Sequence, residues 1–193
     1  MNFKELVKVN RTCRRYDNSK KVSMKQLEEL VDLVRYTPCG ANRQSLRFVL
    51  INDKEINEKI YDNIAWAGYL KDWDGPVKEE RPTGYIVFVS DSQYGKPMLE
   101  DVGIASQTIS LGARFEGMAV CIFKAYKEEP IKEILELGDK YNIHLVMAIG
   151  YPVEEAVIDN IKVGEDIKYY RDKNGVHHVP KIVTEDTIIK KNL

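Results

Sequence analysis

An uncharged helical segment in the middle of the chain places the strongest constraint on how this sequence can fold. Helical character runs from Pro97 to about Gly117, and the centre, Gly103–Ala113, has apolar or small residues on every side and no charge. The pattern predicts a long helix enclosed on all sides, whose small residues let neighbouring backbones approach closely. A chain of 193 residues encloses such a helix more easily with a second subunit, so the segment favours a homodimer.

Predicted helices alternate with predicted strands along the chain as far as Pro152. The strands are Leu46–Ile51, Gly84–Ser90, Ala119–Phe123 and Ile143–Gly150. The other helices begin at the capping box of Ser23 and end at Thr37-Pro38, run from the N-cap Asp53 to about Trp66, and span Pro130–Leu137. This alternation predicts an α/β layer architecture.

The sequence changes character after Val153. This part is charged, and Asp172-Lys173-Asn174-Gly175 is typical of a hairpin turn between Tyr169-Tyr170 and Val176–Val179. The last segment, Ile182–Leu193, keeps more apolar residues than a free tail needs. We therefore expect one domain over residues 1–193, in which residues 153–193 form a C-terminal arm that contributes to the dimer.

Composition excludes several classes of protein. A net charge of −1 supplies no field to attract nucleic acid or an anionic membrane. The 3 cysteines are widely spaced and form no CxxC pair, which indicates neither a zinc site nor a disulfide framework. No apolar run approaches the roughly 20 residues of a membrane helix, and the N-terminus has no signal-peptide pattern. A reducing cytoplasm is the expected location.

A basic stretch, Asn10–Tyr16, follows a short amphipathic segment, Phe3–Val9. Guanidinium groups bind oxyanions through paired hydrogen bonds, and the spacing of Arg11 and Arg14 can bring both to one side, with the Thr12 hydroxyl between them. The stretch is either a phosphate clamp or a solvated basic face, and short charge runs are usually the latter. Residues 66–82 are irregular and contain both tryptophans, so they form either a lid over a planar ligand or a surface loop.

Four motifs in the same order and spacing resemble the nitroreductase family of FMN-dependent oxidoreductases. The stretch Arg11–Tyr16 resembles the family's Arg-Ser-x-Arg-x-aromatic element, and Pro38–Leu46 resembles Pro-Ser-x-x-Asn-x-Gln-Pro-Trp. The Gly-x-x-x-Cys element Gly117–Cys121 and the segment Ala148–Pro152 complete the match, which covers nearly the whole chain.

The resemblance implies an α/β (α+β) fold, a three-layer sandwich with a central mixed sheet flanked by helices. It also implies how FMN would be bound. Arg11, Thr12 and Arg14 would hold the phosphate, the loop after Pro38 would come partly from the other subunit, and the Phe123 amide would face the reactive ring nitrogen. The implied cofactor-binding set is Arg11, Thr12, Cys13, Arg14, Pro38, Cys39, Asn42, Gln44, Ile122, Phe123 and Lys181. The expected substrate pocket comprises Trp66, Tyr69, Trp73 and Lys124.

This sequence departs from the family pattern at several of these positions. Thr12 and Cys39 replace serines, Lys124 replaces a glycine, and Ser45-Leu46 replace Pro-Trp, so that one aromatic wall is missing. We expect these departures to change which substrate binds more than which cofactor binds.

The implied activity is hydride transfer from NADH or NADPH to FMN and on to a planar acceptor, such as a nitroaromatic or quinone, in ping-pong order. The protein would supply no catalytic side chain and bind no metal. Two alternatives stay open: a flavin-consuming or dehalogenating relative, and a flavin-storage or redox-sensing protein with little turnover. We expect His144, Cys13 and Cys121 to be structural, and the pair His177-His178 to be exposed or interfacial.

Overall fold

The computed structural model describes residues 1–191, so Leu193, the end of the expected apolar tail, lies outside the described residues. The chain divides into two compact units. The first comprises residues 1–66 and 75–153, and the second comprises residues 67–74 and the part of the chain from Glu154 onward. The second boundary falls next to Val153, where the sequence changes character.

The first unit contains a four-stranded sheet in the order β1 (Leu46–Ile51), β2 (Gly84–Asp91), β4 (Tyr141–Gly150) and β3 (Ala119–Phe123). All neighbouring strands are antiparallel, so the expectation of a mixed central sheet was wrong. The reason lies in the connections: the segments joining β1 to β2 and β3 to β4 each begin and end at the same end of the sheet. The parallel strands β2 and β3 are joined through a helix, but β4 lies between them.

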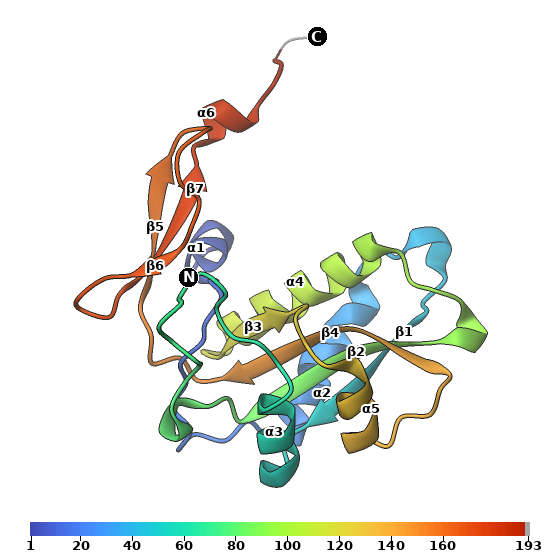
Figure 1. Ribbon diagram of the computed structural model, residues 1–193. Coiled ribbons are helices and arrows are strands. Elements are labelled where there is room, and N and C mark those ends of the chain that lie inside the picture. The colour runs from blue at the N-terminus through green and yellow to red at the C-terminus, as the bar shows by residue number, and fades with distance from the viewer. Residues whose placement is uncertain (192–193) are drawn as a thin grey trace. The chain divides into compact units, whose positions relative to one another are not determined.

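Helices cover both faces of this sheet, which confirms the layered α+β fold (Figure 1). On one face lie α2 (Met24–Asp32) and α4 (Leu99–Phe115), and on the other lie α3 (Lys54–Tyr61) and α5 (Glu128–Ile134). The central strand β2 is buried along its whole length, with Ile86 and Phe88 facing α4 and Tyr85 and Val87 facing α3 and α5.

Local signals placed the starts of α2 and α3 correctly, whereas α4 begins at Leu99 and α5 at Glu128, each two residues from the predicted start. Ser23 and Gln26 form the expected capping box of α2, and the Asp53 carboxylate accepts the amides of Glu55 and Ile56. The helix α3 ends at Tyr61, earlier than the predicted Trp66. The shorter elements of the first unit are α1 (Phe3–Val9) and the 3-10 turns η1 (Leu33–Tyr36), η2 (Gly40–Asn42), η3 (Lys78–Glu80) and η4 (Ser92–Tyr94).

The central helix α4 is covered by the sheet, α1, α2 and η1, but it keeps an exposed strip. Ala105, Ile109 and Ala113 are buried against the sheet and α2, whereas Gln107 is exposed and Phe115 is 66% exposed. Within one chain the helix is therefore not enclosed on all sides, because Gln107 and Phe115 stay exposed.

The second unit contains a three-stranded sheet in the order β5 (Ala156–Ile161), β7 (His177–Ile182) and β6 (Tyr170–Arg171), and a short helix α6 (Thr184–Thr187). The predicted hairpin is present: β6 pairs antiparallel with β7, and Gly175 has φ of +82°, a value that glycine adopts easily. His177 is buried at 1% exposure and packs against Tyr169, so the expectation of an exposed or interfacial histidine was wrong for this residue.

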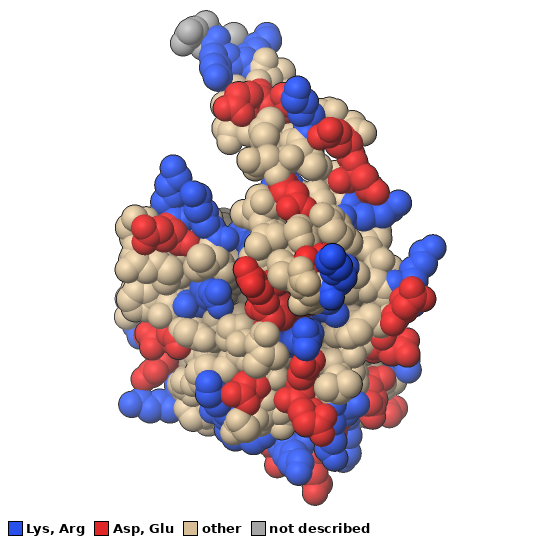
Figure 2. Space-filling view, turned by 90° about the vertical axis from the view of Figure 1, so that its left-hand side faces the viewer, with Lys and Arg blue, Asp and Glu red and all other residues tan. Residues whose placement is uncertain are grey.

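Acidic and basic side chains are interspersed on the face drawn in Figure 2, in keeping with the net charge of −1. Within residues 1–191, no helix combines the length and apolar character needed to cross a membrane.

Candidate functional site

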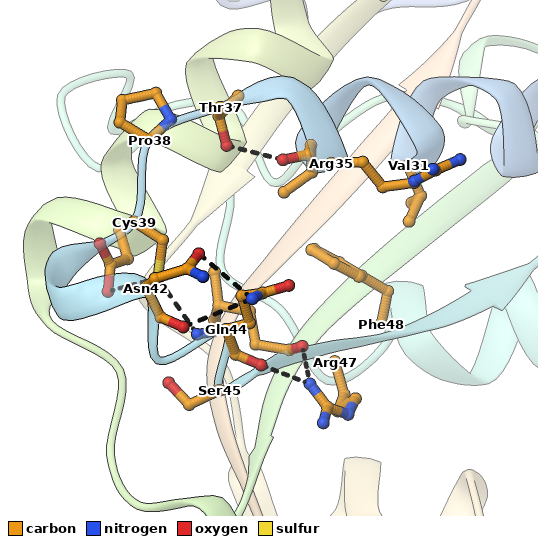
Figure 3. A pocket seen from close by; sticks show the side chains of 13 residues that line it. Val31, Arg35, Thr37, Pro38, Cys39, Asn42, Gln44, Ser45, Arg47 and Phe48 are labelled. Atoms are coloured by element: carbon orange, nitrogen blue, oxygen red, sulfur yellow. Dashed lines mark hydrogen bonds between the residues drawn. The ribbon is translucent and has the colours of Figure 1, made fainter.

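The loop between η1 and β1 has a strained backbone. Ala41, Asn42 and Gln44 have φ values of 49°, 51° and 48°, in the left-handed region that residues other than glycine rarely adopt. Such strain persists only where the surroundings impose it, and it concentrates at functional sites. The side chains of Asn42 and Gln44 are exposed and hydrogen-bonded to each other, so the loop presents amide groups to a ligand (Figure 3).

A carboxylate on α4 holds this loop in place. Asp101 Oδ1 accepts the Gly40 N–H at 2.8 Å, and Oδ2 lies 3.6 Å from the Cys39 thiol, which in turn accepts the Gln44 N–H at 3.2 Å. Asp101 is buried and lies in the first turn of α4, where the helix dipole favours a negative charge. Sequence reasoning missed Asp101, since its only signal was an acidic residue at a helix start.

A cavity of about 230 Å³ opens beside the loop. The structure brings four predicted residues together in its lining: Pro38, Cys39, Asn42 and Gln44. It adds Arg35, Ser45, Arg47 and Phe48, for which sequence reasoning gave no role in binding.

The basic stretch lies along β3. Its Cys13 N–H donates to the Val120 carbonyl at 2.9 Å, Thr12 is exposed, and Arg14 is buried at 8% exposure. Arg11 Nη2 donates to the Val7 carbonyl at 2.9 Å, whereas its Nε is buried and has no hydrogen-bond partner among the described residues. Partial burial lowers the pKa of Arg11. A desolvated guanidinium with an unsatisfied N–H is suited to an anion.

The strand β3 presents one exposed apolar side chain between two buried ones. Ile122 is 42% exposed, whereas Cys121 and Phe123 are buried in the core. Cys13 is also buried, next to Ala119. The expectation that Cys13 and Cys121 are small buried side chains is confirmed.

The four residues expected to form the substrate pocket belong to different units. In the first unit, the Trp66 ring lies 4.7 Å from Phe123 and 5.5 Å from Tyr61, so Trp66 packs against the core. Lys124 Nζ donates to the His144 carbonyl. In the second unit, the Tyr69 ring lies 5.0 Å from Tyr169, and the Arg171 guanidinium lies over the ring of Trp73. Lys181, from the expected cofactor set, is exposed on β7 of the second unit.

The histidine of β4 has a structural environment. His144 Nε2 lies 2.7 Å from Ser90 Oγ, and burial together with the charge of Lys124 lowers its pKa, which favours the neutral imidazole at pH 7. Among residues 1–191, no group of three or more His, Cys, Asp and Glu side chains is arranged to hold a metal ion.

The layered α+β fold thus carries an arginine with an unsatisfied Nε and a strained loop with exposed amides, two features suited to binding a small molecule. A model of the nitroreductase family matches residues 7–151. The chain belongs to the nitroreductase family.

Individual relatives agree with this assignment. The Bacillus subtilis protein YdgI, whose name ascribes to it an NAD(P)H nitroreductase activity, is 32% identical, and the match covers 79% of this chain and 90% of that protein. An iodotyrosine deiodinase from Haliscomenobacter hydrossis is 23% identical, with 79% and 80% covered. A structure from Exiguobacterium sibiricum, solved in complex with FMN, superimposes with a TM-score of 0.67 at 19% identity, covering 80% of this chain and 90% of that one.

Proposed function

We propose that this protein is an FMN-dependent oxidoreductase that passes reducing equivalents from NADH or NADPH to a planar acceptor, such as a nitroaromatic or a quinone. The observation that carries the proposal is the buried, unpaired Nε of Arg11, in the stretch that resembles the family's Arg-Ser-x-Arg-x-aromatic element. Family relatives named for NAD(P)H-dependent nitroreduction and a structural neighbour solved with FMN support the choice of cofactors.

The residues present fit FMN. Arg11 and Arg14 with the Thr12 hydroxyl would hold the phosphate, since a charged donor to a phosphate oxygen forms the stronger kind of hydrogen bond. Ile122 presents an exposed apolar surface on the edge strand next to this stretch, which suits a flat ring. The amides of Asn42 and Gln44 would contact the flavin edge, in this or a neighbouring subunit. Lys181 stays a candidate for the phosphate.

When bound, FMN would supply the hydride chemistry, with the nicotinamide and the acceptor using the same face in ping-pong order. The protein itself would bind FMN, orient it and shield it from water. The Asp101 carboxylate binds the Gly40 amide and thereby holds the strained loop. The buried Phe123 packs against Trp66 and fixes the end of β3. We assign no proton transfer to a side chain.

Steady-state oxidation of NADH and NADPH by the FMN-loaded protein tests the proposal. The expected result is a low rate without acceptor and a rate at least tenfold higher with a nitroaromatic or a quinone. Double-reciprocal plots of the initial rate against nicotinamide concentration that are parallel at several fixed acceptor concentrations would support ping-pong order. A yellow protein that oxidises neither nicotinamide would contradict the proposal and would favour flavin storage or sensing, which the departures at Leu46 and Lys124 make a real alternative.

Dehalogenation is the second alternative. It is favoured by the likeness to an iodotyrosine deiodinase, although that relative is only 23% identical. Iodide release from a halogenated phenol under reducing conditions, at a rate above that of nitro reduction, would select it.

The working unit is proposed to be a homodimer. The exposed strip of α4 supports this, because Leu111 and Phe115 line an apolar cavity of about 550 Å³ together with Leu6 of α1 and Leu33 of η1. A partner would bury this surface. Light scattering across a dilution series, with flavin fluorescence followed in parallel, should show dissociation and FMN release together. A stable monomer that retains FMN would contradict the dimer.

Deletion of Ile182–Leu193 tests the proposed arm. It should lower dimer stability and FMN retention in parallel. If neither decreases, the arm does not contribute to the dimer.

A further inference from the structure

The stretch that would hold the FMN phosphate begins at a residue buried against the central helix. Asn10 is 7% exposed, and its side-chain Oδ1 accepts the hydroxyl of Ser110 in α4 at 2.9 Å. Ser110 is 5% exposed, and the two residues lie 100 positions apart in the chain. Because both groups are buried, water does not replace this hydrogen bond when one partner is removed.

The Ser110 hydroxyl differs from the other hydroxyls of α4 in where it donates. Ser106 Oγ and Thr108 Oγ1 each donate to a carbonyl one turn earlier in the same helix. Such bonds are a common way for a hydroxyl inside a helix to be satisfied. Ser110 donates to a separate segment instead, so its hydroxyl forms a tertiary contact.

The helix before the basic stretch depends on contacts of this kind. None of the residues of α1 is buried, and a helix of 7 residues is marginal in water by itself. Leu6 and Val7 are only half-buried. At the C-terminal end of α1, the Asn10 N–H donates to the Leu6 carbonyl at 3.0 Å, while the Asn10 side chain reaches α4. Asn10 therefore joins the end of α1 to the central helix.

The position of α1 in turn decides the position of the Arg11 guanidinium. Arg11 Nη2 donates to the carbonyl of Val7 in α1 at 2.9 Å, whereas its buried Nε has no hydrogen-bond partner among the described residues. If the end of α1 shifts, the Val7 carbonyl moves and the guanidinium loses its support. The contact between Asn10 and Ser110 thus holds the arginine that would bind the phosphate.

A second anchor lies on the other side of the stretch. The Cys13 N–H donates to the Val120 carbonyl of β3 at 2.9 Å, and the Tyr16 hydroxyl donates to the Cys13 carbonyl at 2.5 Å. Arg11 and Thr12 lie between the two anchors, one on α4 and one on β3. A binding segment that is fixed at both ends loses little conformational freedom when its ligand binds.

We propose that Ser110 and Asn10 are positioning residues for FMN, which hold the Arg11 clamp in place from the central helix. The Ser110 hydroxyl fixes the Asn10 amide, Asn10 fixes the end of α1, and α1 supports Arg11; neither positioning residue needs to contact the phosphate. This inference rests on the proposed function, because it concerns how the cofactor of that reaction is bound.

A comparison of FMN with riboflavin tests the inference, since riboflavin has the same ring system and no phosphate. Fluorescence titration of the full chain, after removal of bound flavin, gives both dissociation constants. Ser110→Ala should weaken FMN binding about three- to tenfold, the loss expected for one neutral hydrogen bond, and should change riboflavin binding less than about twofold.

Ser106→Ala is the matched control. Ser106 lies on the same helix and is also buried, but its hydroxyl is bonded within α4. This variant should change the affinity for either flavin by less than about twofold.

A double-mutant cycle tests whether the two positioning residues act as a pair. Asn10→Ala should weaken FMN binding at least as much as Ser110→Ala, and the double variant should bind FMN no more weakly than Asn10→Ala alone. Ser110→Thr keeps the hydroxyl and should keep most of the preference for FMN over riboflavin.

Three results would overturn the inference. Equal losses of FMN and riboflavin affinity in Ser110→Ala would assign Ser110 a structural role only. Additive losses in the double variant would show that Asn10 and Ser110 act separately. A loss of FMN affinity in Ser106→Ala as large as that in Ser110→Ala would point to a general effect of substitutions in α4.

Arg11→Ala separates this inference from the proposed function. The wild type should prefer FMN over riboflavin at least about tenfold, and Arg11→Ala should remove most of that preference. If Arg11→Ala removes it and Ser110→Ala keeps it, the clamp stands and the inference fails. Equal binding of both flavins by the wild type would contradict the clamp and the inference together. A preference for FMN that depends on Ser110, in a protein that oxidises no nicotinamide, would support the inference and contradict the proposed function.

Discussion

The Asp101 carboxylate accepts the Gly40 amide at 2.8 Å and thereby joins the start of α4 to the loop before β1. The two residues lie 61 positions apart in the chain. Because the same carboxylate also reaches the Cys39 thiol, one buried side chain holds the loop in its left-handed conformation.

Replacement of Asp101 tests this coupling. Asp101→Ala should leave the Gly40 amide unsatisfied, which costs about 1–3 kcal/mol of folding stability, and should weaken FMN binding because the loop loses its conformation. Urea unfolding and flavin-fluorescence titration measure the two effects. Glu100→Ala, in the same turn but exposed, is the control. Unchanged FMN affinity in Asp101→Ala would separate the loop from the cofactor.

The phosphate clamp predicts a loss of FMN affinity in two arginine variants. Arg11→Ala and Arg14→Ala should each weaken FMN binding by about 1.5–3 kcal/mol, or roughly ten- to a hundredfold, if each makes one charged hydrogen bond. FMN rather than FAD should copurify. Arg15→Ala is the matched control, since Arg15 forms a two-point ion pair with Glu80 at 2.6 Å. Equal losses in all three variants would indicate a general charge effect instead of a clamp.

The aromatic segment predicts different behaviour for its members. Trp66→Ala should lower the free energy of unfolding by about 2 kcal/mol or more, because the ring packs on Phe123 and Tyr61. Trp73→Ala and Tyr69→Ala, in the second unit, should alter acceptor kinetics with little change in FMN affinity if their segment borders the substrate. Thermal melts and acceptor kinetics distinguish the roles. An unchanged free energy of unfolding in Trp66→Ala would contradict the core role of Trp66 and favour the alternative that it is part of a lid over the ligand.

His144 predicts a pH dependence of stability. Its pKa in the folded protein is lowered by burial and by Lys124, whereas in the unfolded chain it returns to about 6.5. As the pH falls through about 6.5, the unfolded chain takes up a proton that the folded protein refuses, so stability decreases toward the lowered pKa. Urea unfolding should be measured from about pH 7.5 to about pH 5. Over this range the free energy of unfolding should decrease less in His144→Gln than in the wild type. Identical slopes in both proteins would contradict the shift.

Signals within a few residues of each other were sufficient for much of the secondary structure. The caps at Ser23 and Asp53, the apolar strand around Phe88 and the turn at Gly175 were all predicted correctly. Each rests on hydrogen bonds or burial set by neighbouring residues, so the sequence alone carries the information. The motif order was likewise enough to place the chain in its family.

Contacts between distant segments decided the rest. The purely antiparallel sheet follows from which end of the sheet each connection reaches, and the burial of His177 follows from the strands that surround it. The sequence determined most of the helices and strands of the first unit and the hairpin of the second, and that a basic stretch and an amide-bearing loop exist. Only the tertiary structure brought Asp101 to Gly40 and Ser110 to Asn10 and left a strip of α4 exposed, because no local pattern specifies which distant groups meet.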